Sequence, residues 1–68
     1  MGEVEAVVVQ ASSFDLHGVR YADVTVSYPD APPEQARLGP EGAPGDLAAG
    51  ERVLVTRVAN MIVSIRRP

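Results

Sequence analysis

The chain of 68 residues contains no cysteine, no lysine and no tryptophan, and only three of its side chains are aromatic. The absence of cysteine excludes disulfide scaffolds, zinc ribbons, thiol nucleophiles and dithiol redox motifs. The longest uninterrupted apolar run, residues 6–9, is far shorter than the ~20 residues of a membrane-spanning helix. The first residues, 1–3, lack the apolar stretch of a signal peptide. We therefore expect no membrane partner and no secretion directed by a signal peptide.

The length allows one domain over residues 1–68, with a core so small that the fold is marginally stable alone. The formal net charge is −3 and is unevenly distributed. Residues 1–50 carry eight acidic side chains and two arginines, which sum to −6, whereas residues 51–68 carry one glutamate and four arginines, which sum to +3. The overall basic footprint of a nucleic-acid-binding domain is absent, but a local basic patch is expected at the C-terminal end. The use of arginine alone, with much alanine and valine, is typical of a GC-rich genome.

Apolar and polar side chains alternate with a period of two over residues 3–10 and 19–28, which predicts two strands. The intervening residues 11–18 are rich in turn formers and predict a loop. The side chains expected to face the core are Val4, Ala6 and Val8 in the first strand and Ala22, Val24, Val26 and Tyr28 in the second.

Residues 29–50 hold five of the six prolines and four of the six glycines, which predicts a long excursion between strands. Structureless loops of this length are uncommon in compact domains, so some local structure is expected within it. Residues 35–38 are favoured as a short strand, and a single helical turn over 33–37 is the competing prediction.

The last part of the chain predicts a hairpin of two strands, 52–58 and 61–66, joined by a two-residue turn at Ala59 and Asn60. In this register the facing pairs on the side expected to be inward are Val58 with Met61, Thr56 with Val63, and Leu54 with Ile65. A type I′ turn prefers Asn followed by Gly, so a longer turn with Asn60 at positive φ is also possible.

Four or five short strands separated by Gly and Pro, with no convincing helical periodicity, predict an all-β protein. The expected architecture is a small OB-like or SH3-like barrel that carries the long loop at 29–50. Closing the sheet into a barrel also removes the exposed edges that a flat sheet of this size would have.

The segment Leu47-Ala-Ala-Gly-Glu-Arg-Val-Leu-Val55 places a leucine anchor and a glycine turn before a Val-x-Val strand. With the two Val-rich strands before it and the hairpin after it, the layout resembles an OB-fold, and in particular the OB modules of tailed-phage tails and baseplates. The chain departs from such modules in lacking an aromatic residue in its middle segment. The usual OB helix would have to fit within residues 39–50, which contain Pro40 and Pro44. The resemblance implies a structural subunit of a virion or tail-like particle.

The sequence offers no convergent catalytic groups. His17 is the only histidine, and Asp15 and the serines beside it lie too close in one segment to act as a triad. The acidic residues are scattered; Asp30 and Glu34 could touch a hard cation, but a solvated loop is the favoured interpretation. Residues 39–45 are glycine-rich but lack the lysine and the helix of a phosphate-binding loop. We expect no enzyme activity, no cofactor and no metal site.

Two surfaces are candidates for binding a partner. The face of the closing hairpin opposite the expected core would be one such surface, although its arginine stems could simply cover the valines beside them. Its residues are Val53, Val55, Arg57, Ile62, Arg66 and Arg67. The secondary candidates are Val7, Val9, Phe14 and Tyr21.

The function expected from these features is a non-catalytic protein-interaction or assembly module, located in the cytoplasm or in a virion. Its partner would be another protein or a second copy of the chain, which would also stabilise a marginal fold. The alternative is an OB-type binder of single-stranded nucleic acid or oligosaccharide. Nucleic acid is disfavoured because such surfaces need a positive groove and several stacking aromatics.

Overall fold

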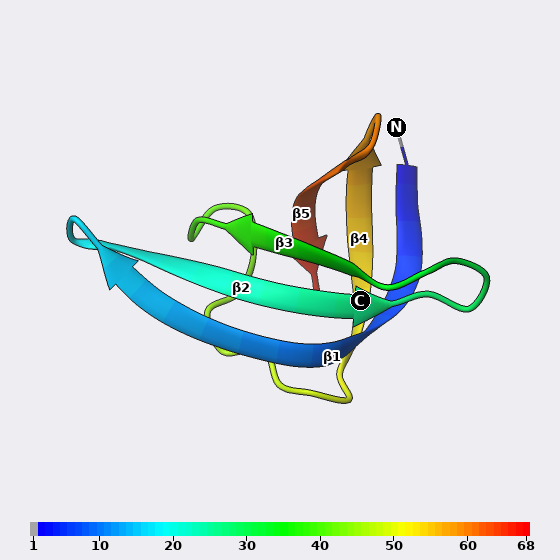
Figure 1. Cartoon of the computed structure of the whole chain (residues 1–68), viewed down its shortest axis with the longest axis horizontal. Helices are drawn as coiled ribbons and strands as arrows, with labels where there is room; N and C mark the ends of the chain where they lie inside the picture. Colours follow the sequence, from blue (N-terminus) through cyan, green and yellow to red (C-terminus); the bar gives the residue numbers. More distant parts are fainter. Residues whose placement is uncertain (1) are drawn as a thin grey trace.

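In the computed structural model, which describes residues 2–68, the chain forms five antiparallel strands in one curled sheet, a half-barrel, and no helix. The strands are β1 (Gly2–Leu16), β2 (Val19–Ser27), β3 (Glu34–Leu38), β4 (Arg52–Val58) and β5 (Met61–Arg66). Their order across the sheet is β3-β2-β1-β4-β5 (Figure 1). The predicted all-β class is confirmed. Nothing in the described range forms a helix long and apolar enough to span a membrane.

Strand β1 lies at the centre of the sheet and has a different neighbour along each half of its length. Its residues 2–7 pair with β4, and its residues from Val7 onward pair with β2. A β-bulge at Val9 shifts the register between these halves. At the bulge, the Val8 N–H donates to the Glu51 carbonyl (2.9 Å) and the Val8 carbonyl accepts from the Gly50 N–H (2.7 Å). β1 therefore passes from one half of the sheet to the other without a break.

The prediction of a loop over residues 11–18 is wrong, because β1 continues to Leu16. The turn is made by His17 and Gly18 alone, with φ angles of 51° and 78°. Positive φ at both central residues is the signature of a type I′ turn, whose twist matches that of the flanking strands. Ser12 and Ser13, expected to form turns, are paired with β2 instead.

The core is a cluster of small aliphatic side chains from every part of the sheet. The predicted inward positions Ala6 and Val8 of β1, and 22, 24 and 26 of β2, are buried, and Tyr28 packs against the cluster from its edge. Val4 was expected in the core but is 44% exposed, because it lies beyond the cluster near one end of the sheet. The fully buried side chains are Val8, Val24, Val26, Val53 and Val55.

The bounds of the predicted closing hairpin are confirmed, but its register is only partly so. Arg57 faces Ile62, as the predicted register requires. Beyond that pair, Val63 is bulged out, so that Thr56 faces Ser64 and not Val63. The positive φ lies at Ala59 (55°) and not at Asn60.

The face of this hairpin that points toward the core is also the opposite of the predicted one. Val53, Val55 and Ile62 were assigned to an outward partner-binding face, but all three are buried in the core. The bulge at Val63 allows both Ile62 and Ile65 to point inward, although they are three residues apart. The arginine on the same face, Arg57, was taken as the mark of an outer surface, whereas it lies at the rim of the core beside an acidic partner.

The long excursion contains the predicted short strand, β3, and the competing helical turn does not form. Residues 39–51 then cross the inner side of the half-barrel and bury Ala43 and Leu47 in the core. The Ile65 N–H donates to the Gly42 carbonyl (2.7 Å), which joins this segment to β5. A Cβ atom at Gly42 would lie 3.3 Å from that of Leu38, so any larger residue would need the Leu38 side chain to shift by a few tenths of an ångström. β3 and β5 contact each other without pairing, and the barrel stays partly open between them.

The hairpin of β1 and β2 extends beyond the rest of the sheet. β3 pairs with β2 only from Ala22 onward, so residues 13–21 form a two-stranded projection that we call the arm (Figure 1). The molecule measures 36 × 25 × 20 Å. Its accessible surface is 4444 Å², whereas a compact chain of this size is expected to expose about 4,100 Å². The excess agrees with a projecting arm.

Substituting Ala59→Gly should stabilise the protein. Alanine at positive φ is strained, and the first position of this two-residue turn favours glycine. The free energy of unfolding is expected to rise by about 1 kcal/mol, which corresponds to about 4–8 °C in Tm for a domain of this size. Thermal unfolding followed by circular dichroism measures the shift. The control is Asn60→Gly, at a position without positive φ, which should bring no gain; an equal gain there would contradict the turn geometry.

Candidate functional site

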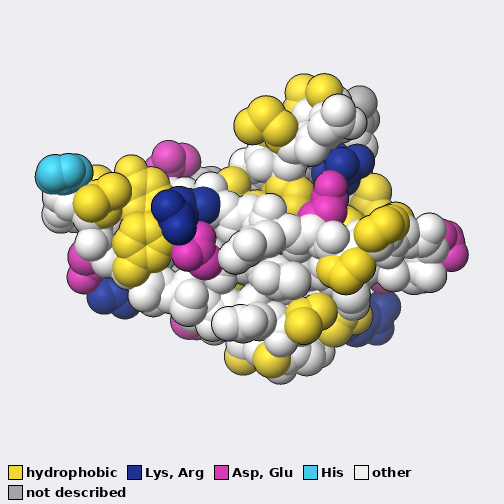
Figure 2. All heavy atoms as spheres, in the orientation of Figure 1, with side chains coloured by type: hydrophobic (Ala, Val, Ile, Leu, Met, Phe, Trp, Pro, Cys, Tyr) yellow, Lys and Arg dark blue, Asp and Glu magenta, His cyan; other side chains and the backbone are white. Residues whose placement is uncertain are grey.

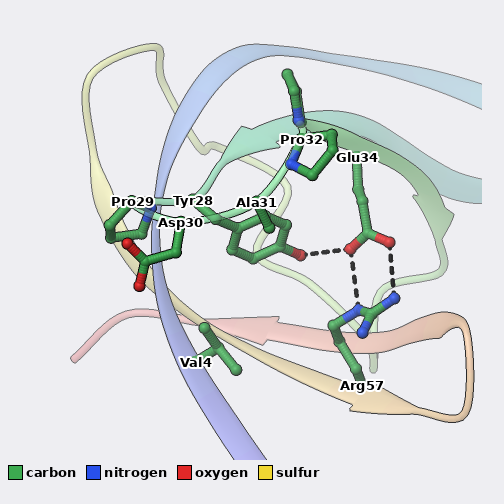
Figure 3. Close-up of a pocket in the computed structure, with 9 residues that line it drawn as sticks. Val4, Tyr28, Pro29, Asp30, Ala31, Pro32, Glu34 and Arg57 are labelled. Carbon is green, nitrogen blue, oxygen red and sulfur yellow. Dashed lines mark hydrogen bonds and ion pairs between the residues drawn. The ribbon is translucent and has the colours of Figure 1, made fainter.

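A cleft of about 540 Å³ opens beneath the loop that connects β2 to β3 (Figure 3). Pro29 ends β2, because proline cannot donate a ladder hydrogen bond, and the loop continues as Asp-Ala-Pro-Pro to residue 33. Val4 of β1 lies across the cleft from this loop. The wall is mostly apolar, and its polar end is formed by Tyr28, Glu34 and Arg57.

These three polar residues form one hydrogen-bonded network, drawn in Figure 3. The Tyr28 hydroxyl donates to Glu34 Oε1 (2.6 Å). Arg57 binds the same carboxylate in a bidentate manner, with Nε at 3.0 Å from Oε1 and Nη2 at 2.8 Å from Oε2. The side chains of Arg57 and Glu34 are 34% and 29% exposed, which makes this ion pair the most sheltered on the described chain.

The network changes the protonation equilibria of its members. Burial, assisted by the hydrogen bond to the negatively charged Glu34, raises the pKa of Tyr28 to about 12. The hydrogen bonds from Tyr28 and Arg57 to Glu34 hold the pKa of that carboxyl below its ordinary value. At neutral pH, Glu34 is therefore ionised and Tyr28 keeps its proton.

The chemical consequence is a satisfied clasp, in which Glu34 accepts three hydrogen bonds and Arg57 neutralises its charge. Neither group is left as a poised base or nucleophile. The clasp ties the end of β2 and the start of β3 to β4, across the mouth of the curled sheet. Over residues 2–68, no cluster of three or more histidine or acidic side chains is placed to hold a metal ion.

A second group of side chains lies on the outer face of the sheet, at the base of the arm. The rings of Phe14 and Tyr21 stack with centroids 5.6 Å apart and planes at 22°. The guanidinium of Arg37, on β3, lies 4.8 Å from the centre of the Phe14 ring. Arg37 also binds Asp23, with Nε at 2.9 Å from Oδ1. This group therefore spans three strands, and the two aromatic candidates from the sequence are brought together.

The arm carries further apolar side chains that no described element covers. Leu16 and Val19 flank the turn and are 49% and 40% exposed. Figure 2 shows hydrophobic side chains gathered along the arm, behind the histidine at its tip. The other two secondary candidates, Val7 and Val9, are exposed as predicted, but lie on the main sheet away from the arm.

All six arginines are paired with carboxylates, so the expected basic patch at the C-terminal end does not exist. Arg66 binds Glu3 (Nη2 to Oε1, 2.8 Å), and this contact holds the pKa of Glu3 below its ordinary value. Arg67 binds Glu51 (2.7 Å) and Asp46 (3.1 Å). The remaining pairs are Arg20 with Asp15, Arg37 with Asp23, Arg52 with Glu5, and Arg57 with Glu34.

The predicted partner-binding face is thus dispersed. Three of its members are core residues, Arg57 belongs to the clasp, and Arg66 and Arg67 lie in neutralised pairs. Sequence reasoning missed Leu16 and Val19, although an apolar residue on each side of His-Gly is a recognisable hairpin signal. It also missed that Glu34 pairs with Arg57, and no pattern within the sequence indicates a contact between residues 23 positions apart.

Comparisons of the chain with protein-family models, with curated proteins and with solved structures found no match. The function must therefore be inferred from the fold and the surface of the molecule. Of the two surfaces, the cleft has a self-satisfied network as its polar end, whereas the arm leaves the apolar side chains of Leu16 and Val19 exposed.

Removing the charge of Glu34 should lower the pKa of Tyr28. Both the hydrogen bond and the negative charge of Glu34 favour the protonated phenol, so Glu34→Gln should bring the value down from about 12 toward the ordinary one of about 10. A titration followed by tyrosinate absorbance measures it, in a Tyr21→Phe background that leaves Tyr28 as the single tyrosine. Because the folded state holds this proton more tightly than the unfolded state, stability should fall as the pH rises above about 10. An unchanged titration curve in Glu34→Gln would contradict the clasp.

Substituting Tyr28→Phe should lower the free energy of unfolding at pH 7 by about 1.5 kcal/mol, because it deletes a partly buried hydrogen bond to a charged acceptor. Urea unfolding measures the change. Tyr21→Phe is the matched control, since the hydroxyl of Tyr21 has no hydrogen-bond partner within residues 2–68, and its effect should stay within about 0.5 kcal/mol. Equal losses from both variants would mean that the Tyr28 hydroxyl adds nothing specific.

Proposed function

We propose that this protein is a non-catalytic interaction module that joins a larger assembly, and that the arm is its contact surface. The observation that carries the proposal is the projection of residues 13–21 beyond the sheet with apolar side chains exposed. Arg37 and residues 39–45 lie against the base of the arm, but Leu16 and Val19 beside its turn stay exposed. A two-stranded ribbon with so little packed on it is marginally stable in water at best. A partner that covers the arm would supply the missing contacts and stabilise the whole domain.

The strand order supports the OB version of the barrel. β1 lies between β2 and β4, and β5 approaches β3, which is the arrangement expected of a partly open five-stranded Greek-key barrel. In OB-folds, the face of the second and third strands and the loops between strands one and two and between strands four and five make the contacts to ligands. Here the arm and its base provide the strand face and the first of these two loops. The version of the proposal in which the assembly is a virion or tail-like particle rests on the layout resemblance alone.

The second candidate function is binding of single-stranded nucleic acid or oligosaccharide. The observation in its favour is the group of Phe14, Tyr21 and Arg37, which lies on the face that OB-folds use. Against nucleic acid stands the pairing of every arginine with a carboxylate, which leaves no positive groove to follow a phosphate backbone. The protein-interaction function is therefore favoured.

The proposal is tested by photocrosslinking in the cells that make the protein. A benzophenone amino acid replaces Leu16 in the arm or, as the control, Met61 at the start of β5. Met61 is also apolar and is 66% exposed, against 49% for Leu16, so a difference between them cannot reflect exposure alone. Irradiation should give discrete protein adducts from position 16 and none from position 61. Absence of adducts at position 16, equal adducts at both positions, or adducts removed by nuclease would each contradict the proposal.

A further inference from the structure

We infer that the base of the arm and the residues of β1 just before it bind a second copy of this chain, through edge-to-edge pairing of β1 with β1 along residues 11–15. The inference rests on the proposed function and names its partner. It follows from the main-chain groups that β1 leaves unpaired and from the side chains on either side of them.

The edge of β1 opposite β2 has no neighbouring strand beyond Val7 in the described structure, because the pairing with β4 ends there. Leu16 and Val19 close the two-residue turn as a hydrogen-bonded pair. Main-chain groups alternate in direction along a strand, so those of Ser12 and Phe14 also face β2. The N–H and C=O groups of the alternate residues, Ala11, Ser13 and Asp15, therefore point away from the sheet.

This edge lacks the features with which proteins usually prevent strand addition, namely proline, lysine, an interrupting bulge or an unpaired charge. Residues 10–16 contain no proline or lysine, and the bulge at Val9 lies before them. The single charged side chain, Asp15, is engaged by Arg20 at 3.1 Å on its own hairpin. Ala11, Ser12 and Ser13 are small, so their own side chains do not hinder the approach of another backbone. The segment of Pro44, Gly45 and Leu47 lies beside them on the inner side of the sheet, so a second strand has to approach in the plane of the sheet.

The edge is complementary to itself when a two-fold axis passes through Ser13. Ser13 then faces Ser13 of the second copy, and Ala11 faces Asp15 of the second copy in both directions. These are the residues whose main-chain groups point outward, and each such facing pair exchanges two N–H···O bonds in an antiparallel ladder. Every outward group from Ala11 to Asp15 is satisfied in this register, and no two acidic side chains face each other.

The outer face of the same pairing favours a second copy over an unrelated strand. Phe14 would lie opposite Ser12 of the second copy, which places a large side chain beside a small one. The two Phe14 residues become diagonal neighbours with Cα atoms about 7–8 Å apart, within the reach of aromatic side chains. Because Phe14 already stacks on Tyr21, the two stacks would join into one aromatic strip across the axis.

The first test uses the absence of cysteine from the natural chain. Facing residues of a hydrogen-bonded pair have Cα atoms about 5.5 Å apart, inside the range that a disulfide spans. Purified Ser13→Cys should therefore form a covalent dimer under mild oxidation. Gln10→Cys is the matched control, because two copies of position 10 would lie about 20 Å apart, six residues along the strand. A monomeric Ser13→Cys, or equal dimer from both variants, would overturn the inference.

The second test breaks the pairing while preserving the fold. Ser13→Pro removes an N–H that points away from β2, and proline is tolerated at such edge positions. In sedimentation velocity, the wild-type chain should dimerise as its concentration rises, and a folded Ser13→Pro variant should stay monomeric. A Ser13→Pro variant that dimerises like the wild type would place the interface elsewhere and overturn the inference.

The two proposals fail in different ways. Adducts from position 16 whose mass is twice that of the chain would support both the interaction module and the second-copy partner. Adducts of another mass, with a purified wild-type chain that stays monomeric, would overturn the second-copy partner and leave the interaction module standing. Absence of adducts at position 16 would remove the interaction module itself.

Discussion

The bulge at Val9 is the feature on which the rest of the structure depends. It allows one 15-residue strand to pair with β4 over its first half and with β2 over its second, and it is fixed by the hydrogen bonds of Val8 with Gly50 and Glu51. Even-numbered side chains such as Val8 face inward before the bulge and odd-numbered ones such as Ala11 after it, yet both sets face the same core. Because β1 leaves β4 near this point, its remaining residues have no strand on their second edge, and from Ser13 onward they project as the arm. The core, the curl and the proposed contact surface thus share one origin.

The distribution of charge along the sequence indicates a basic patch at the C-terminal end, but in the fold the arginines pair with carboxylates instead. The acidic first part and the basic last part of the chain are brought together by the fold, as Arg66 with Glu3 and Arg52 with Glu5 illustrate. Exposed pairs of this kind contribute little stability each, so the valine core and not the ion pairs must hold the domain together. What the pairs do is cancel the charge of every arginine, and recognition is left to shape, apolar contact and main-chain hydrogen bonds. The Tyr28–Glu34–Arg57 clasp is the one sheltered member of the set, and it fastens the loop end of β2 and β3 to β4.

The alternation of valines was sufficient to predict the class, the bounds of β4 and β5 and the buried face of β2. The short strand β3, which has no valine, was predicted because long structureless loops are uncommon in compact domains. The errors arise where one extra residue shifts the alternation of inward-facing and outward-facing side chains along a strand. A bulge at Val9 and another at Val63 each reverse which side chains face inward, and neither bulge leaves a signal in a single amino-acid sequence. The hairpin was then inverted because Arg57 was assumed to face solvent, and only the distant Glu34 makes its inward position favourable. Residues 11–18 were predicted as a loop because Ser12, Ser13 and Asp15 were given more weight than the His-Gly turn that follows them.

The most direct test of the account is amide hydrogen exchange along β1, measured by NMR at low and at high protein concentration. At low concentration, the amides of Ser12 and Phe14, bonded to β2, should be protected, and those of Ala11, Ser13 and Asp15 should exchange rapidly. At high concentration, the second group should become protected while the first changes little. Rapid exchange at all five positions would show that the arm does not form, and unprotected outward amides at high concentration would contradict the pairing of a second copy along this edge.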